Sequence, residues 1–165
     1  MNDIRLRKFQ AGDAPRVAEL VNDYELSRWT SSIPYPYSLQ DAVGWIAQQP
    51  DSERCAWAVV HDDSLVGCVS HWPDADTAGA EEIGYWIGRH WWGRGICSAA
   101  LELLFQQPGF PVQKPLVAKV MKGNPASGRP LLKAGFRAAG TTHIEVRGQS
   151  VESLQFEREA VEIQP

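Results

Sequence analysis

Short runs in which apolar and polar residues alternate recur along the chain, and each run predicts a β-strand. The first covers residues 4–9, where isoleucine and leucine alternate with arginine. Two apolar runs at residues 55–60 and 65–70 flank the polar segment 61–64, a pattern typical of a β-hairpin. The remaining strands are predicted at residues 82–87, 116–121, 136–146 and 151–158, with a turn at 147–150 joining the last two.

Apolar residues at helical spacing predict four helices, at residues 14–22, 39–48, 96–105 and 125–134. The expected helix boundaries are Asp13, Ser38 and Asn124 as N-caps, Pro15 and Pro125 in first turns, and Gly135 as the stop of the last helix. Runs of strands with helices inserted between them predict an α+β or mixed α/β fold. We expect a single domain over residues 1–165, with one central, mostly antiparallel sheet of six or seven strands flanked by helices.

Residues 24–37 show neither the alternation of a strand nor the spacing of a helix, because Pro34 and Pro36 prevent a regular element there. The segment is crowded with aromatic residues, among them Trp29, Tyr35 and Tyr37. Two interpretations are equally open. The aromatic side chains either pin a loop to the core, or form one wall of a substrate pocket.

Composition narrows the class of protein. The chain has 165 residues, a net charge of −4 and three widely spaced cysteines, Cys55, Cys68 and Cys97. The negative charge argues against a nucleic-acid binder. The odd, scattered cysteines indicate reduced thiols in a cytoplasmic protein, and the histidines lack metal-ligand spacing, so no metal is expected. The N-terminus does not resemble a signal peptide, and no apolar run is long enough to span a membrane.

A glycine-rich loop between the strand at 82–87 and the helix at 96–105 carries the clearest chemical signal. Its centre reads Trp92-Gly93-Arg94-Gly95-Ile96-Cys97-Ser98. Glycines allow the backbone to approach a ligand closely, and the first amides of a helix are unpaired and favour anions. Arg94 adds a cation. The loop therefore predicts a phosphate site, and it is not a P-loop because no Gly-Lys-Ser/Thr follows the second glycine.

Four motifs in this order resemble the GNAT superfamily of acetyl-CoA-dependent N-acetyltransferases, in particular its ribosomal-protein N-terminal acetyltransferase-like branch. The quoted motifs are Leu6-Arg7-Lys8-Phe9 with Asp13-Ala14, Glu82-Ile83-Gly84-Tyr85-Trp86-Ile87, the loop Trp92–Ile96, and Asn124-Pro125-Ala126-Ser127 followed by Leu132-Lys133-Ala134-Gly135-Phe136. The resemblance covers nearly the whole chain. Two positions depart from the wider superfamily: Cys97 stands where Gly or Ala is usual, and Trp92 where many members have Arg or Gln.

The resemblance implies direct transfer of an acetyl group from acetyl-CoA to an amine. An amine attacks only when neutral, so a general base is needed, and Glu82 is the first candidate over its neighbour Glu81. A solvated surface carboxylate is the alternative interpretation of Glu82. A bulge at residues 85–88 is expected to supply a backbone amide to the oxyanion, provisionally that of Tyr85, while Ile87 faces the pantetheine arm.

No tyrosine follows Tyr85 in the chain, although many superfamily members use one to protonate the leaving thiolate. Ser127 is the remaining candidate, and its alternatives are cofactor contact or a hydrogen bond within its own helix. Asn124 is expected to cap that helix, contact the cofactor, or do both. Ser98 is expected to cap its helix or contact phosphate.

The cofactor contacts implied by the resemblance are Tyr85, Trp86, Ile87, Trp92, Gly93, Arg94, Gly95, Ile96, Cys97, Ser98, Asn124 and Ser127. The acceptor contacts are Trp29, Tyr35 and Tyr37. Cys97 invites a second mechanism, an acetyl-cysteine relay with a thiol pKa lowered at a helix N-terminus. Direct transfer is favoured, because Cys97 belongs to the phosphate loop rather than to the thioester end.

The leading functional hypothesis is thus an N-acetyltransferase acting on a protein N-terminus or a small-molecule amine. The alternative is a catalytically inactive acyl-CoA-binding module that has kept the loop and lost the chemistry. The expected partners are acetyl-CoA and the amine, with no nucleic acid and no membrane. A homodimer is left open.

Overall fold

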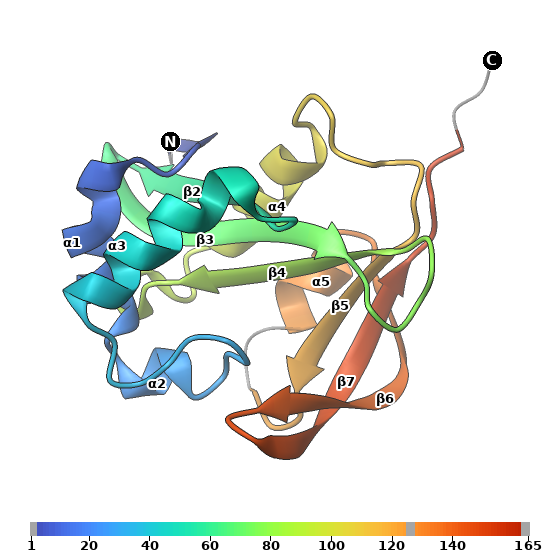
Figure 1. Cartoon of the computed structure of the whole chain (residues 1–165). Helices are drawn as coiled ribbons and strands as arrows, with labels where there is room; N and C mark the ends of the chain where they lie inside the picture. The colour runs from blue at the N-terminus through green and yellow to red at the C-terminus, as the bar shows by residue number, and fades with distance from the viewer. Residues whose placement is uncertain (1–2, 125–127, 163–165) are drawn as a thin grey trace.

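The computed structural model describes residues 3–124 and 128–162, and its strands form one seven-stranded sheet (Figure 1). The strand order is β1-β2-β3-β4-β5-β7-β6, and every neighbouring pair is antiparallel except β4 and β5. The strands are β1 (Ile4–Arg7), β2 (Cys55–His61), β3 (Ser64–Pro73), β4 (Glu81–Ile87), β5 (Leu116–Met121), β6 (Arg137–Val146) and β7 (Gln149–Arg158). The predicted mixed fold and its mostly antiparallel sheet are confirmed.

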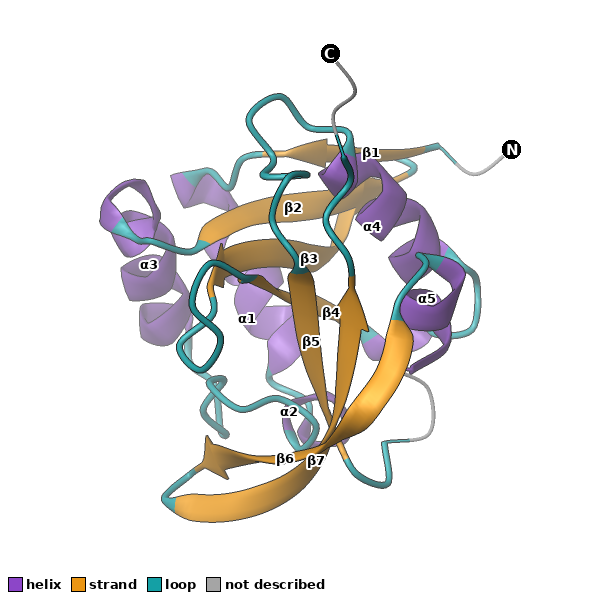
Figure 2. Cartoon of the chain, turned by 90° about the vertical axis from the view of Figure 1, so that its right-hand side faces the viewer, coloured by secondary structure: helices purple, strands orange, loops and turns teal. Residues whose placement is uncertain are grey.

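The helices cover both faces of the sheet, with α1 and α3 on one side and α4 and α5 on the other (Figure 2). The α-helices are α1 (Ala14–Val21), α2 (Tyr24–Ser27), α3 (Leu39–Gln48), α4 (Ile96–Phe105) and α5 (Gly128–Lys133), and the 3-10 helices are η1 (Ala11–Asp13), η2 (Gln49–Asp51) and η3 (Arg89–Trp91). Two hydrophobic clusters result, because each face of the sheet buries the apolar stripe of its own helices. No helix in the described part of the chain is long and apolar enough to cross a membrane.

Local sequence signals account for most of the positions at which helices and strands begin and end. Ser38 and Asp41 form the predicted capping box at the start of α3, with Ser38 Oγ accepting from the Asp41 amide at 3.1 Å. The β2–β3 turn is tighter than expected, because Asp62 and Asp63 both adopt positive φ and close the hairpin with two residues. Gly135, at φ 88°, ends α5 as predicted.

Two expectations need correction. Asp13 stands at the start of α1, but its carboxylate does not cap that helix; it accepts from the Arg7 guanidinium at 2.8 and 2.9 Å and from the Gln10 amide. Residues 24–37 are not wholly irregular, since α2 forms there behind the capping carboxylate of Asp23. The four-residue helix is too short to show a periodic pattern in the sequence.

The parallel pairing of β4 and β5 ends almost as soon as it begins. Only Glu81 and Glu82 have partners on β5, and beyond them the two strands diverge (Figure 1). The edge of β4 that faces β5 carries the backbone groups of Tyr85 and Ile87, because Gly88 donates to Val66 on the β3 side and the pattern alternates. The sheet therefore opens at its centre, with a strand edge along the opening.

Candidate active site

A cavity of about 1080 Å³ lies where β4 and β5 diverge, on the face of the sheet covered by α1 and α3. Aromatic residues line much of it; they are Trp29, Tyr37, Trp45, Trp72, Tyr85 and Trp86. Tyr37 is buried, and burial together with the nearby Asp41 raises the pKa of its phenol to about 12. Its hydroxyl is therefore neutral at physiological pH.

Two of the three aromatic residues expected to contact the acceptor line this cavity, namely Trp29 and Tyr37. Tyr35 is not among its lining residues. The Tyr35 ring is exposed and packs edge-on against Tyr24, with 5.5 Å between ring centroids. The aromatic segment thus divides between a cavity wall and an outward-facing pair, combining features of both interpretations of residues 24–37.

Alternation along β4 separates the two carboxylates that the sequence left in competition. Glu82 points into the cavity, whereas Glu81 points to the opposite face and is buried. There, Glu81 accepts from Lys114 Nζ at 3.1 Å and lies 2.7 Å from His71 Nδ1. Glu81 therefore belongs to a structural polar cluster, and Glu82 is the carboxylate that the cavity exposes.

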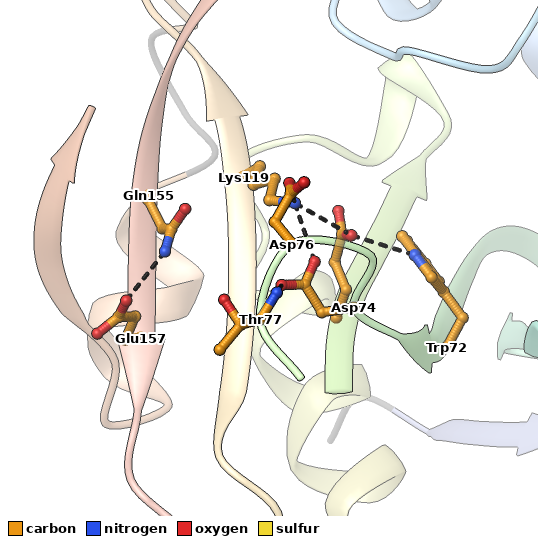
Figure 3. A network of polar contacts seen from close by, with 8 residues as sticks. Trp72, Asp74, Asp76, Thr77, Lys119, Gln155 and Glu157 are labelled. Atoms are coloured by element: carbon orange, nitrogen blue, oxygen red, sulfur yellow. Dashed lines mark hydrogen bonds and ion pairs between the residues drawn. The ribbon is translucent and has the colours of Figure 1, made fainter. Parts of the chain in front are cut away.

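A polar network fixes Glu82 from two sides. The Trp72 indole Nε1 donates to Glu82 Oε2 at 3.1 Å, and the Lys119 ammonium lies 3.6 Å from the same oxygen. Lys119 also pairs with Asp74 at 2.9 Å and with Asp76 at 2.8 Å, so it ties the loop after β3 to β5 (Figure 3). The Asp74 side chain is fully buried, which makes this tie part of the interior rather than a surface ion pair.

The balance of these contacts raises the pKa of Glu82 above its ordinary value. Burial is the largest cause, because it disfavours the charged carboxylate. The Lys119 charge and the Trp72 hydrogen bond act in the opposite direction, and the neighbouring Asp74 raises the pKa further. A carboxylate with a raised pKa is a stronger base than an exposed one, which suits a group that accepts a proton from an amine.

Gly84 allows Trp72 to lie flat against β4. A Cβ atom at this position would fall 2.5 Å from Cη2 of the Trp72 indole, closer than any carbon contact tolerates. The missing side chain thus makes room for the ring that donates to Glu82. This role of Gly84 had no signal in the sequence, since the contact joins residues twelve positions apart on neighbouring strands.

The glycine-rich loop leads from the end of β4 into α4. Gly95 is the N-cap residue of α4, with φ 76°, and Gly93 also has positive φ at 73°. A Cβ atom at either position would meet nothing within 4 Å, so open space surrounds both glycines. The first amides of α4 therefore face an accessible surface, as an anion site requires.

The remaining residues of this loop have varied environments. Trp92, half-exposed, donates its Nε1 to the Ile87 carbonyl at 2.6 Å and so ties the loop to the end of β4. Ser98 does not cap α4, which has no side-chain cap. Burial raises the pKa of the Cys97 thiol, opposite to the lowering considered for a relay. Arg94 is exposed beside the two glycines.

Asn124 and Ser127 were both expected near the start of the last helix. Asn124 lines the cavity, and its backbone N–H donates to the Met121 carbonyl at 3.1 Å. The described helix α5 begins at Gly128. Ser127 lies outside the described residues, as do Pro125 and Ala126, so the predictions for Ser127 stay predictions. The expected bulge is not seen, because β4 pairs with β3 in unbroken register from Glu81 to Ile87.

Sequence reasoning missed three residues that surround Glu82, namely Trp72, Asp74 and Lys119. Asp74 lies just after β3, and a buried aspartate there carries no local signal in the sequence. Lys119 is the single charge in an apolar strand, Leu-Val-Ala-Lys-Val-Met, and that interruption was the available clue. In the ranges 3–124 and 128–162, no group of three His, Cys, Asp or Glu side chains is placed to hold a metal.

Comparison with known proteins agrees with this geometry. A model of the acetyltransferase (GNAT) domain matches residues 3–137. The putative ribosomal N-acetyltransferase YdaF of Bacillus subtilis (strain 168) is 31% identical over 108 residues, which span 61% of this chain and 59% of that protein. This chain therefore matches less than two thirds of that relative's length.

Solved structures share the fold at low sequence identity. The microcin C7 self-immunity acetyltransferase MccE, in complex with acetyl-CoA and AMP, superposes with a TM-score of 0.80 at 22% identity, covering 94% of this chain and 92% of that one. RimJ of Mycobacterium smegmatis, in complex with CoA-disulfide, superposes with a TM-score of 0.79 at 22% identity. The match covers 95% of this chain and 82% of that one. With the domain match over residues 3–137, this chain belongs to the acetyltransferase (GNAT) family.

Proposed function

We propose that the protein is an N-acetyltransferase that moves the acetyl group of acetyl-CoA directly to a primary amine, with Glu82 as general base. One observation carries this proposal: Glu82 is the β4 carboxylate that enters the cavity at the divergence of β4 and β5. Its raised pKa suits a group that must take a proton near neutral pH. The ribosomal N-acetyltransferase name of YdaF supports a protein N-terminus as one acceptor class.

The cofactor is assigned to the edge of β4 and the start of α4. The pyrophosphate would lie at the open surface around Gly93 and Gly95, where the first α4 amides and Arg94 supply positive charge. The pantetheine arm would extend along the edge of β4 that carries the backbone groups of Tyr85 and Ile87. This path leads the thioester toward Glu82, and it places Trp92 and Cys97 at the phosphate end.

In the reaction, Glu82 accepts a proton from the acceptor amine, directly or through a water molecule. The neutral nitrogen attacks the thioester carbon and forms the new C–N bond, the C–S bond breaks, and the nitrogen releases its second proton to water. A backbone amide on the edge of β4 stabilises the oxyanion, and the CoA thiolate leaves with a proton from Ser127 or water. The raised thiol pKa of Cys97 supports this direct route over a cysteine relay, because a relay needs a thiolate.

A matched pair of variants tests the proposal. Glu82→Gln keeps the shape and removes the basicity, so kcat should fall by about 10²- to 10⁴-fold, the range of general acid–base catalysis. Glu81→Gln, measured per folded molecule, should keep its turnover because Glu81 is on the other face. Initial rates of acetyl-CoA consumption with several amines provide the readout.

The opposite ranking of the two variants would refute the assignment of the base. If the wild type binds acetyl-CoA and turns over no amine, the inactive acyl-CoA-binding module is the better description. Intersecting initial-rate lines are expected for direct transfer, and parallel lines with a mass increase of one acetyl group on the protein would indicate a relay.

A further inference from the structure

The cavity holds a second cation, Arg54, that the proposed chemistry does not use. Arg54 lies immediately before β2 and lines the cavity wall with its side chain partly buried. Its guanidinium stacks over the Trp72 indole, 3.7 Å from the ring centroid. A stacked guanidinium keeps its N–H donors at the edge of the plane, where they remain available to another group.

No carboxylate in the described ranges forms an ion pair with Arg54. Glu82, the carboxylate whose charge acts on Arg54, pairs with Lys119 instead. Glu82 still stabilises the Arg54 charge at longer range, but burial outweighs that attraction and lowers the pKa of Arg54 below its ordinary value. An arginine nevertheless stays charged in proteins.

A partly buried charge without a direct partner is costly, because its hydration is lost and no ion replaces it. Arg54 differs in this respect from Lys119, which lies nearby and has three carboxylates around it. A ligand that brought its own anionic group would restore the missing partner. Planar guanidinium donors match a carboxylate or a phosphoryl group in a bidentate arrangement.

On the basis of the proposed acetyl transfer, we propose that Arg54 is a specificity residue that binds an anionic group of the acceptor, so that the preferred substrates are primary amines that also carry a carboxylate or phosphoryl group. Trp72 connects the two ends of such a substrate. One face of its indole supports Arg54, and its Nε1 donates to Glu82. The amine would lie at Glu82 and the anion at Arg54, both beside the same ring.

Other charges of the cavity are consistent with an acceptor bearing both signs. Asp41 and Asp51 line the cavity and are exposed, so they attract a protonated amine without neutralising Arg54. Lys119 is held by Asp74 and Asp76 and leaves Arg54 as the cation available to an anion. A volume of about 1080 Å³ admits a short peptide as well as a small metabolite.

The test uses acceptors in matched pairs that share the amine and differ in the anion. Alanyl-glutamate amide with alanyl-glutamine amide tests the carboxylate source, and O-phosphoethanolamine with ethanolamine tests the phosphoryl source. The variants are Arg54→Gln, Arg54→Lys and a control, Arg5→Gln, whose exposed guanidinium pairs with Asp63 and does not line the cavity. Each protein is assayed for kcat and KM with every acceptor.

Wild type should prefer the anionic member of at least one pair. Arg54→Gln should lower kcat/KM for that member by about 10- to 100-fold, as expected for a lost hydrogen bond to a charged group. The loss should appear mainly in KM, with the neutral member and acetyl-CoA binding unchanged. Arg54→Lys should recover part of the loss, and Arg5→Gln should match wild type.

Two results would overturn the role of Arg54. One is an equal loss of kcat/KM for both members of each pair in Arg54→Gln, and the other is a wild type that does not prefer the anionic members. Calorimetric titration of the same acceptors into the CoA-bound protein separates this inference from the proposed function. If no amine is turned over but the anionic members bind more tightly through Arg54, the inference stands and the transferase proposal fails. If amines are turned over without any preference for the anionic members, the transferase proposal stands and the inference about Arg54 fails.

Discussion

Glu81 and Glu82 are consecutive residues on β4, and the sheet gives them opposite environments. Glu81 is buried against His71 and Lys114 on the face covered by α4. Glu82 enters the cavity on the other face, held by Trp72 and Lys119. The same functional group is thus satisfied as part of the interior on one side and is left accessible for chemistry on the other.

The difference shows that the direction of a strand residue, and not its residue type alone, decides the chemistry of its side chain. A closed polar cluster provides every hydrogen-bond partner and contributes to the stability of the fold. The open cluster leaves part of the Glu82 carboxylate accessible from the cavity, while burial raises its pKa and makes it useful as a base. Substitutions at Glu81 on one face, and at Lys119 and Trp72 on the other, alter the two clusters separately.

The largest effect on stability is expected on the closed side. Glu81→Gln removes the charge that Lys114 and His71 face, so the free energy of unfolding should fall by about 2 kcal/mol. This is less than the roughly 3–5 kcal/mol of a fully buried pair because the Lys114 side chain is half-exposed. Urea denaturation measures the change, and Glu82→Gln is the control. A larger loss in Glu82→Gln would show that the open cluster supports the fold.

A smaller effect is expected from Lys119→Gln, which removes a positive charge beside Glu82 and keeps a donor for Asp74. The pKa of Glu82 should rise further, because Lys119 favours its charged form. The base is active when deprotonated, so kcat/KM increases with pH through this pKa. We expect the rising limb of the profile of kcat/KM against pH to move toward alkaline values.

The matched control for Lys119→Gln is Asp76→Asn. Asp76 contacts the same lysine, but its side chain is exposed and does not contact Glu82. Its pH profile should coincide with that of the wild type. A profile for Lys119→Gln that does not move, or moves toward acid, would separate Lys119 from the ionisation of Glu82.

The smallest effect is expected from Trp72→Phe, which keeps an aromatic ring and removes the Nε1 donor to Glu82. One hydrogen bond to a carboxylate should shift the rising limb by less than a full unit, again toward alkaline pH. The Glu81 cluster should not respond, so the free energy of unfolding should change by no more than the lost ring area requires. A pH profile identical to wild type would show that this hydrogen bond does not tune the base.

Signals within a few residues of one another were readable from the sequence. The capping box of Ser38 and Asp41 fixed the start of α3, and the glycine pair before residue 96 fixed the start of α4. The strand at residues 82–87 was also readable, and its position relative to a family motif favoured Glu82, the carboxylate that lines the cavity. Local rules succeed here because each involves a contact within one turn or one strand.

The rest of the site depends on contacts between distant segments. Arg54, Trp72 and Lys119 come from a loop and two strands, and nothing near them in the sequence shows that they meet. Tyr35 shows the converse, because its aromatic neighbours suggested a pocket residue and the backbone turned it outward against Tyr24. In an irregular segment the sequence has no periodic pattern, so it does not predict the direction in which a side chain points.

Gly84 limits how this protein can change over generations. Any L-residue there would collide with Trp72, so a substitution at residue 84 is tolerated only after a smaller residue has replaced that indole. Loss of the indole in turn removes the surface on which Arg54 rests and the donor to Glu82. The two positions should therefore vary together among descendants, in a fixed order, and a new acceptor preference would follow from that pair of changes.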